Sequence, residues 1–281
     1  RYRLAKGSLT SRTMHVGQRG RGRFVQEGGV NQVEATLQVG GNWYWWEANT
    51  AATEGTAEAD MASVLPPHYY PIPRGTYVLQ DGALSTGRTE VGVGGVGRFV
   101  QSGGSHKVAG AIRIGGGPYW SLPTMEPVEP GTALPEIWPP YPGPSKGSYE
   151  MIDGRLHAAR IDVGAGYTPW PYPWDYEPSN ATLTDVARPV APWSWGVFRQ
   201  TGGEVTADAC VSVHGGLYEI ANGSLSAQCI VVGGRYRYDH SRFIQTGGFV
   251  EAGSVHVGAH AYIDRLSVDA DVSGAATDFG R

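Results

Sequence analysis

A short phrase that recurs along the chain constrains the fold more than any other feature of the sequence. In residues 97–104 it reads Gly-Arg-Phe-Val-Gln-Ser-Gly-Gly, and related copies surround Phe24, Phe198 and Phe243. Internal repetition of this kind is the sequence signature of architectures in which similar units stack on one another. Because a stack grows by adding units rather than separate cores, residues 1–281 are expected to form one domain.

A second phrase, which begins with tyrosine, alternates with the first. Its four copies are headed by Tyr2, Tyr77, Tyr149 and Tyr218. Both phrases lead to an aliphatic residue followed by glycine, as in Val16-Gly17, although His214 replaces the glycine in the copy of Phe198. The two phrases are therefore two versions of one unit of about 20 residues, which we call the Phe-type and the Tyr-type repeat.

Apolar and polar residues alternate before each aliphatic-glycine pair. Leu37 and Ile112 precede their pairs at an apolar position, whereas Gln38 and Arg113, one residue later, are polar. Period-two alternation is typical of a strand with one buried face. The pattern predicts an all-β fold, a single-stranded parallel β-helix (β-solenoid) of about eight to nine rungs spaced about 4.8 Å apart. A leucine-rich repeat has units of similar length, but its Asn and Leu spacing is missing.

Each rung begins with an aromatic residue. The rungs are headed by Tyr2, Phe24, Tyr77, Phe99, Tyr149, Phe198, Tyr218 and Phe243, with Tyr262 opening a ninth. These rings are expected to stack in a column, and each stacked pair contributes about 0.5–1.5 kcal/mol beyond burial.

The Phe-type repeat carries a glutamine two residues after the ring, where the Tyr-type repeat carries an apolar residue. The glutamines are Gln26, Gln101, Gln200 and Gln245, and the apolar residues are Leu4, Leu79, Met151 and Ile220. A ligand contact is one interpretation. The favoured one is that each inward-facing amide binds the Gly-Gly corner beside it, because a buried amide without partners is unfavourable.

Three inserts interrupt the repeats. The inserts are residues 42–76, 116–148 and 165–195, and the rungs cover residues 1–41, 77–115, 149–164 and 196–273. All three inserts begin just after an aliphatic-glycine pair, so they are expected to leave the stack along one edge.

The inserts contain every tryptophan of the chain and most of its prolines. The tryptophans are Trp43, Trp45, Trp46, Trp120, Trp138, Trp170, Trp174, Trp193 and Trp195. Pro-aromatic runs such as residues 170–174 favour extended conformations. Because so many exposed rings would form an unusually large apolar patch, the inserts are expected to pack together and to contact a partner or a glycan.

Charge and composition exclude several classes of protein. A net charge of −4 offers no basic patch for nucleic acid, and no apolar run is long enough to span a membrane. The histidines show no metal-ligand spacing, and no cofactor motif is present. Glu90, Arg113 and Asp162 are expected to form surface charge pairs on neighbouring rungs, without the cluster of acids that a polysaccharide-degrading enzyme needs. Asn180 and Asn222 match glycosylation acceptor triplets.

The chain contains two cysteines, Cys210 and Cys229. Each lies three residues before the aliphatic residue of its repeat, on consecutive rungs. In-register stacking would bring their Cα atoms to about 4.8 Å, within the range of a disulfide. The register predicts a disulfide in an oxidising compartment, and two free thiols on a polar face are the alternative.

The Phe-x-Gln-x-Gly-Gly repeats resemble those of bacterial exported surface proteins, namely autotransporter passengers and the related arrays of PEP-CTERM-type proteins. The resemblance covers the rungs, a little over half of the chain, and none of the inserts. It implies a parallel β-helix outside the cytoplasm or at the cell surface, with a structural or adhesive role more often than a catalytic one.

The function predicted from the sequence is that of a non-enzymatic extracellular structural protein whose copies assemble into a filament, sheath or surface layer. Unpaired strand edges at the two ends of a solenoid can add a further copy, although a truncated chain would have the same open ends. The alternative is an adhesin that binds a surface polysaccharide through its tryptophans. A polysaccharide lyase or hydrolase is a third, less favoured class.

Overall fold

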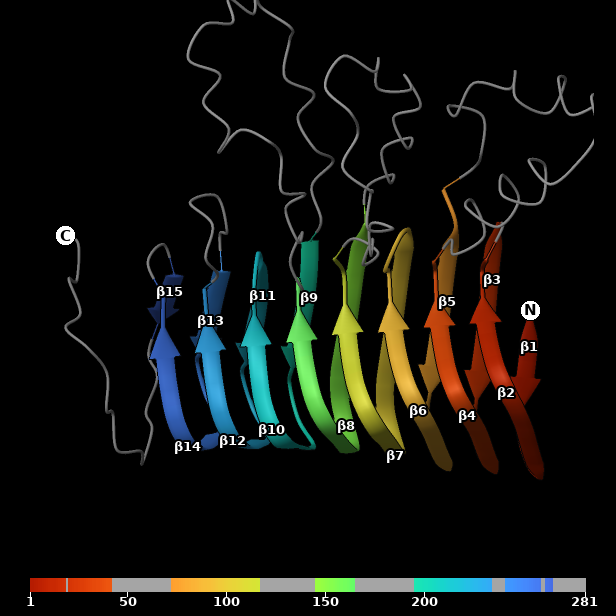
Figure 1. Cartoon of the computed structure of the whole chain (residues 1–281). Helices are drawn as coiled ribbons and strands as arrows, with labels where there is room; N and C mark the ends of the chain where they lie inside the picture. The colour runs from red at the N-terminus through yellow and green to blue at the C-terminus, as the bar shows by residue number, and fades with distance from the viewer. Residues whose placement is uncertain are drawn as a thin grey trace, which may run out of the picture.

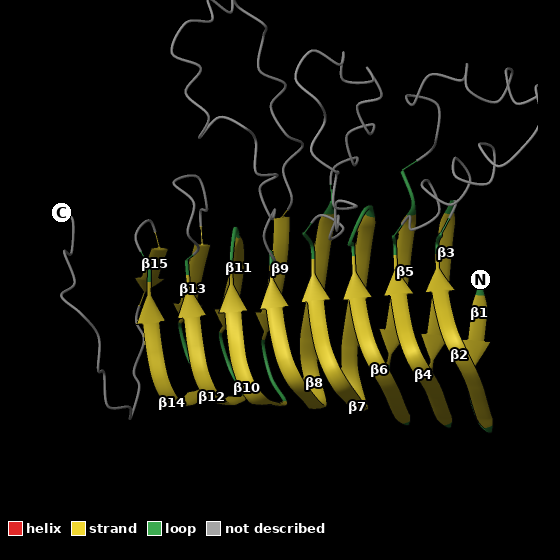
Figure 2. Cartoon of the chain, viewed as in Figure 1, coloured by secondary structure: helices red, strands yellow, loops and turns green. Residues whose placement is uncertain are grey.

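The protein is an all-β chain of parallel strands. The computed structural model describes residues 1–18, 20–41, 72–116, 145–164, 195–233, 241–258 and 261–264. These residues form 15 strands, and they contain no helix that could cross a membrane. Figure 2 shows the strands, with the described loops between them in green.

The strands lie in two rows. The first row contains β1 (Tyr2–Leu4), β3 (Arg21–Gln26), β5 (Arg74–Leu79), β9 (Trp195–Gln200), β11 (Gly216–Ile220), β13 (Ser241–Gln245) and β15 (Ala261–Asp264). The second row contains β2 (Ser8–Val16), β4 (Val30–Val39), β6 (Ala83–Val91), β10 (Glu204–Val213), β12 (Ser224–Val232) and β14 (Phe249–Val257). The long strands β7 (Val96–Ile114) and β8 (Lys146–Val163) take part in both rows.

Neighbouring strands within each row are parallel, and the two rows run in opposite directions (Figure 1). The registers keep the repeats in phase, because Tyr77 pairs with Phe99 and Val91 pairs with Ile114. The predicted all-β chain with parallel, in-register strands is therefore confirmed.

The core lies between the two rows and contains a continuous column of rings. Consecutive ring centroids from Tyr2 to Phe243 are 4.6 to 5.1 Å apart, with planes inclined by 2° to 17°. The rings from Tyr77 to Phe243 are fully buried, whereas Tyr2 is half exposed. The predicted column of stacked rings is therefore present for the eight rungs headed by Tyr2 through Phe243.

A glycine lies two residues before most of these rings, and its Cα atom packs closely against the backbone of an earlier corner. This column contains Gly22, Gly75, Gly97, Gly147, Gly196 and Gly216. A Cβ atom on Gly97 would collide with the Gly92 nitrogen and the Val39 carbonyl oxygen. The strand therefore needs glycine there, and only this residue lets the corner and the next strand approach so closely.

The strands differ from the predicted rungs in two ways. Strands β5, β8 and β9 begin at Arg74, Lys146 and Trp195, before the ring that was taken as the first residue of each rung. Residues 74–76, 146–148 and 195 therefore belong to strands rather than to the inserts. The ninth rung also differs, because Phe243 pairs with Ile263, and Tyr262 pairs with Arg242. Tyr262 consequently does not hold the register of the ring column.

Candidate functional site

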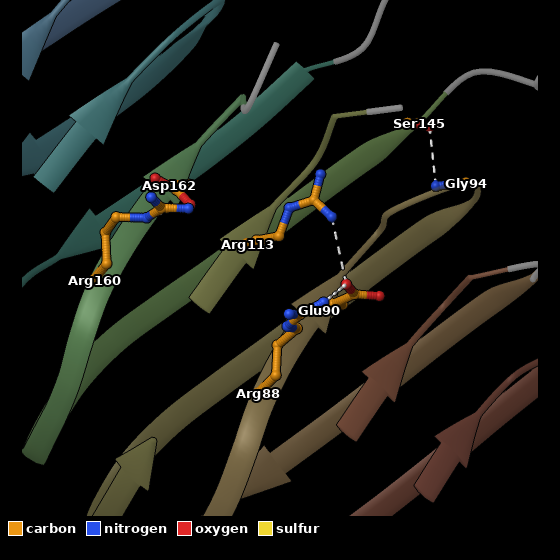
Figure 3. A network of polar contacts seen from close by, with 7 residues as sticks. All are labelled: Arg88, Glu90, Gly94, Arg113, Ser145, Arg160 and Asp162. Atoms are coloured by element: carbon orange, nitrogen blue, oxygen red, sulfur yellow. Dashed lines mark hydrogen bonds and ion pairs between the residues drawn. The ribbon is translucent and has the colours of Figure 1, made fainter. Parts of the chain in front are cut away.

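The most unusual chemistry of the described chain lies at the edge where the inserts leave. The outward residue before each aliphatic-glycine pair forms a column in which Gln38, Glu90, Arg113 and Asp162 are in register on β4, β6, β7 and β8. We call these four residues the corner column. Figure 3 shows its charged members together with Arg88 and Arg160.

The corner column was expected to be exposed, and this expectation is wrong. The exposed fractions of Gln38, Glu90, Arg113 and Asp162 are 1%, 1%, 3% and 5%. At the same slot nearer the two ends of the stack, His15 and His256 are exposed. The predicted register is correct, but strand alternation only tells which way a side chain points. It does not tell what else covers the side chain.

Each charged member of the column takes part in an ion pair. The Arg113 Nη1 atom is 3.4 Å from Glu90 Oε1, across two neighbouring strands. Arg88, two residues before Glu90 on the same strand face, is 3.8 Å from the same oxygen. Arg160 donates from Nε and Nη2 to Asp162 Oδ2 at 2.9 and 2.8 Å. Pairing of this kind is what buried charges require, because removing an ion from water is strongly unfavourable.

Burial raises the pKa of Asp162, while the charges of Arg160, Arg113 and His214 oppose the rise. A raised carboxyl pKa in a buried cluster is a feature of catalytic acids. A glycosidase, however, needs a second carboxylate with room for a sugar or water between the two. Here the rung between Glu90 and Asp162 is occupied by Arg113, so the column has the composition of an ion-pair clamp rather than of an acid-base pair.

Serine side chains fasten the same edge. The backbone N–H of Gly94, in the corner after β6, donates to Ser145 Oγ at 3.0 Å, and Ser145 is buried (Figure 3). The N–H of Gly215 donates to Ser241 Oγ at 2.9 Å in the same manner. Each serine ties a returning chain to the corner of an earlier rung.

Of the predicted partner contacts, the structure describes Trp195. It begins β9, pairs with Lys146 and is partly buried. The remaining candidates lie outside the described residues, as does the predicted packing of the inserts: Trp43, Trp45, Trp46, Trp120, Trp138, Trp170, Trp174 and Trp193. The strands to which the inserts return are aligned, since Val96 pairs with both Arg74 and Lys146, and Lys146 pairs with Trp195.

Cys210 and Cys229 are direct partners in the register of β10 and β12. Their Cα atoms are 4.6 Å apart, and the structure joins them by a disulfide. Within the described ranges, no group of three or more His, Cys, Asp or Glu side chains could hold a metal ion.

The inward-facing glutamines bind the corners, as the favoured interpretation predicts. Gln101 Nε2 donates to the carbonyl oxygen of Gly104 at 3.4 Å and to that of Arg155, in the next rung, at 2.9 Å. Gln26, Gln200 and Gln245 contact the corresponding glycine carbonyls. These glutamine side chains therefore donate to corner carbonyls that would otherwise be buried without donors.

The sequence interpretation missed a side-chain partner of Gln26, Gln101 and Gln200, which is a tyrosine in each case. The Tyr149 hydroxyl donates to Gln101 Oε1 at 2.7 Å, and Tyr77 makes the same bond to Gln26. Tyr218 donates to Gln200 at 3.3 Å. This pairing explains why the two repeat types alternate, because the first three Phe-type rungs each present an acceptor to the Tyr-type rung that follows. The strict association of Phe with Gln, and of Tyr with an apolar residue, was the signal.

A third side chain joins the tyrosine in two places. Asn31 Nδ2 donates to the Tyr77 hydroxyl at 2.9 Å, and His106 Nδ1 lies 3.1 Å from the Tyr149 hydroxyl. We call each trio of glutamine, tyrosine and Asn or His a polar clamp. Burial raises the pKa of both tyrosines, which keeps their hydroxyls protonated as donors.

The contacts of His106 fix its protonation. The Tyr149 hydroxyl donates its hydrogen bond to Gln101, so the tyrosine oxygen must accept from His106. The imidazole therefore carries its proton on Nδ1. The Nε2 atom then accepts from the Thr89 hydroxyl, 3.2 Å away. Burial lowers the pKa of His106 to about 3, so the ring is neutral at physiological pH.

Comparisons with family models, curated proteins and solved structures find no match for this chain.

Proposed function

We propose that this chain is a non-enzymatic extracellular structural protein, built as a single-stranded parallel β-solenoid that carries three aromatic inserts as its interaction surface. The two rows of strands support the solenoid, because each repeat adds one strand to each row and the next repeat returns to the same register. Stacks of this kind are quasi-one-dimensional, and they suit a rod or scaffold.

The observation that carries the proposal is the unbroken column of rings inside the stack. The eight rings from Tyr2 to Phe243 keep stacking on one another, although three inserts interrupt the repeats in the sequence. An interior that is filled in this way provides stiffness and leaves the aligned edge to display the inserts. The closed ion-pair column supports a structural role over a catalytic one.

The disulfide between Cys210 and Cys229 supports an oxidising compartment, as expected for an exported or surface protein. Assembly between copies belongs to the proposal, because parallel strands that pair in register can be extended by strands of another copy. A head-to-tail contact of this type would propagate as a filament or lattice.

Sedimentation velocity of residues 1–281 over a wide range of protein concentration, with electron microscopy of the same samples, tests the proposal. The expected result is species larger than the 30.0 kDa monomer, seen as filaments or sheets. Tyr2→Glu, which places a charge at the half-exposed ring of the column, should reduce assembly. Val30→Glu, at an exposed outward position, is the matched control and should not.

A chain that stays monomeric at every concentration would contradict the assembly. Binding of such a monomer to polysaccharides on a glycan array would instead favour the adhesin.

A further inference from the structure

Asn222 and Gly223 form the corner between β11 and β12, and this corner holds a side-chain amide against a backbone nitrogen. The Gly223 N–H donates to Asn222 Oδ1 at 2.8 Å, and Asn222 is exposed. The neighbouring amides of Ala221 and Ser224 donate to carbonyl oxygens of the preceding rung. The Gly223 nitrogen therefore bonds to the asparagine side chain, beside its Cγ carbon, and not to the ladder.

We propose that Asn222 is a site of spontaneous deamidation. The Gly223 nitrogen attacks Asn222 Cγ, so a ring-closing C–N bond forms while the bond from Cγ to the side-chain nitrogen breaks. Ammonia leaves with the proton that the Gly223 nitrogen gives up, and a cyclic imide remains. Water then adds to one imide carbonyl and opens the ring, giving either an aspartyl or an isoaspartyl residue. Glycine has no side chain to hinder the attack, and asparagine is a thermolabile residue.

The aspartyl product fits this corner, because other Tyr-type repeats already use it. Asp81 accepts from the Gly82 N–H, and Asp153 accepts from the Gly154 N–H, both at 2.7 Å. Deamidation of Asn222 replaces the neutral member of this set by a third carboxylate. The reaction thereby adds one negative charge at the edge of the stack opposite to the corner column.

The isoaspartyl product does not fit. It lengthens the main chain by one carbon at a corner whose strands are paired on both sides, β11 with β9 and β13, and β12 with β10 and β14. A longer corner would pull ladder amides away from their acceptors, and a buried unpaired amide is unfavourable. The folded stack should therefore yield mainly the aspartyl product.

Incubation of the folded chain in mildly alkaline buffer, followed by peptide mapping, tests the proposal. The peptide containing Asn222 should gain the mass that corresponds to replacing an amide by an acid, and an acidic form should grow on ion-exchange chromatography. Asn222→Gln should abolish that form, because glutamine would have to close a larger ring. Asn222→Asp should elute with the acidic form and keep the thermal stability of the parent chain. Asn31, buried in β4, is the internal control and should stay unchanged.

An intact Asn222 in the folded chain, under conditions in which the urea-unfolded chain deamidates at the same residue, would overturn the proposal. An isoaspartyl fraction as large in the folded chain as in the unfolded one would overturn the selection of product by the stack.

Discussion

Two pairs of rungs in this stack are joined by different means. In the pair headed by Phe99 and Tyr149, Gln101 and His106 both bind the tyrosine hydroxyl. In the pair headed by Phe198 and Tyr218, Val205 stands in the slot of His106, and the bond from tyrosine to Gln200 lengthens to 3.3 Å. That second pair has the disulfide between Cys210 and Cys229 instead.

The two pairs also differ in how the chain connects their rungs. Gln101 and Tyr149 are 48 residues apart, with an insert between them, whereas Gln200 and Tyr218 are 18 residues apart. The other three-member clamp, of Gln26 and Tyr77, likewise bridges an insert. Closing a longer loop is entropically less favourable, and at two of the three inserts an extra polar partner joins the rungs on either side. From this comparison we infer that the polar clamp and the disulfide both stabilise the contact between neighbouring rungs, each in a different part of the stack.

Removal of the disulfide is the largest expected effect near neutral pH, and it tests whether the pair headed by Phe198 depends on it. The double variant Cys210→Ala with Cys229→Ala should lose about 3 kcal/mol of unfolding free energy, the value typical of a short closed loop. Urea unfolding measures this change, and the denaturant slope should rise because the unfolded chain without the crosslink exposes more surface.

Thr13→Ala with Thr36→Ala provides the matched control, because these register partners occupy the same slot nearer the N-terminus without a covalent bond. It should stay within about 0.5 kcal/mol of the parent chain. An equal loss in both double variants would mean that the slot, and not the bond, contributes the stability.

Acid should weaken the pair headed by Phe99 through His106. Its pKa is about 3 in the folded chain, below the value of about 6.5 for an unfolded histidine. Below pH of about 6.5 the unfolded chain binds the extra proton, so this stability is complete above that pH and falls by about 1.4 kcal/mol per pH unit toward pH of about 3.

His106→Asn, which installs the residue of the Asn31 clamp, should remove this dependence. The experiment is urea unfolding of both chains at several pH values, because the contributions of the other histidines cancel in the difference. Parallel stability curves for the two chains would contradict a buried, neutral His106.

Much of the fold could be predicted because it depends on position along a repeat. The ring column, the strand registers and the pairing of Cys210 with Cys229 all follow from aligning the repeats on one aliphatic-glycine pair. The start of β5 at Arg74 did not follow, because the alignment began at the ring and overlooked Gly75. That glycine is required by contact with an earlier corner, which a single repeat does not reveal.

The corner column was harder to predict for a different physical reason. The outward position of Glu90 and Asp162 follows from alternation, but their burial depends on neighbours beyond their own strands. The hydrogen bond between Gln101 and Tyr149 was easier to predict from the sequence, because it joins two positions that vary together between the repeat types. A lone repeat suggests a corner role for glutamine, whereas two stacked repeats are needed to find its tyrosine.

Double-mutant cycles should give different coupling energies in the two pairs of rungs. Gln101→Leu leaves corner carbonyls and the Tyr149 hydroxyl with fewer partners, so it should be destabilising by about 1–3 kcal/mol. Adding Tyr149→Phe removes the hydroxyl as well, and the combined loss should be about 1 kcal/mol smaller than the sum of the single losses.

The same cycle with Gln200→Leu and Tyr218→Phe is the internal control. Its coupling should be smaller, because the bond is longer. Equal couplings in the two cycles would remove the distinction between a clamped pair and a disulfide-linked pair.

The smallest expected effect comes from the surface ion pairs, which the two regions share. Arg98 donates to Glu150 at 2.7 Å in one pair of rungs, and Arg199 donates to Glu219 at 2.8 Å in the other. All four side chains are partly open to solvent, so Arg98→Gln and Arg199→Gln should each lower the unfolding free energy by less than about 1 kcal/mol, and less still in high salt. Urea unfolding at low and high ionic strength measures both. If Arg199→Gln were much the more damaging, the pair headed by Phe198 would depend on surface charge as well as on its disulfide, and the contrast with the clamped pair would have to include the outer face.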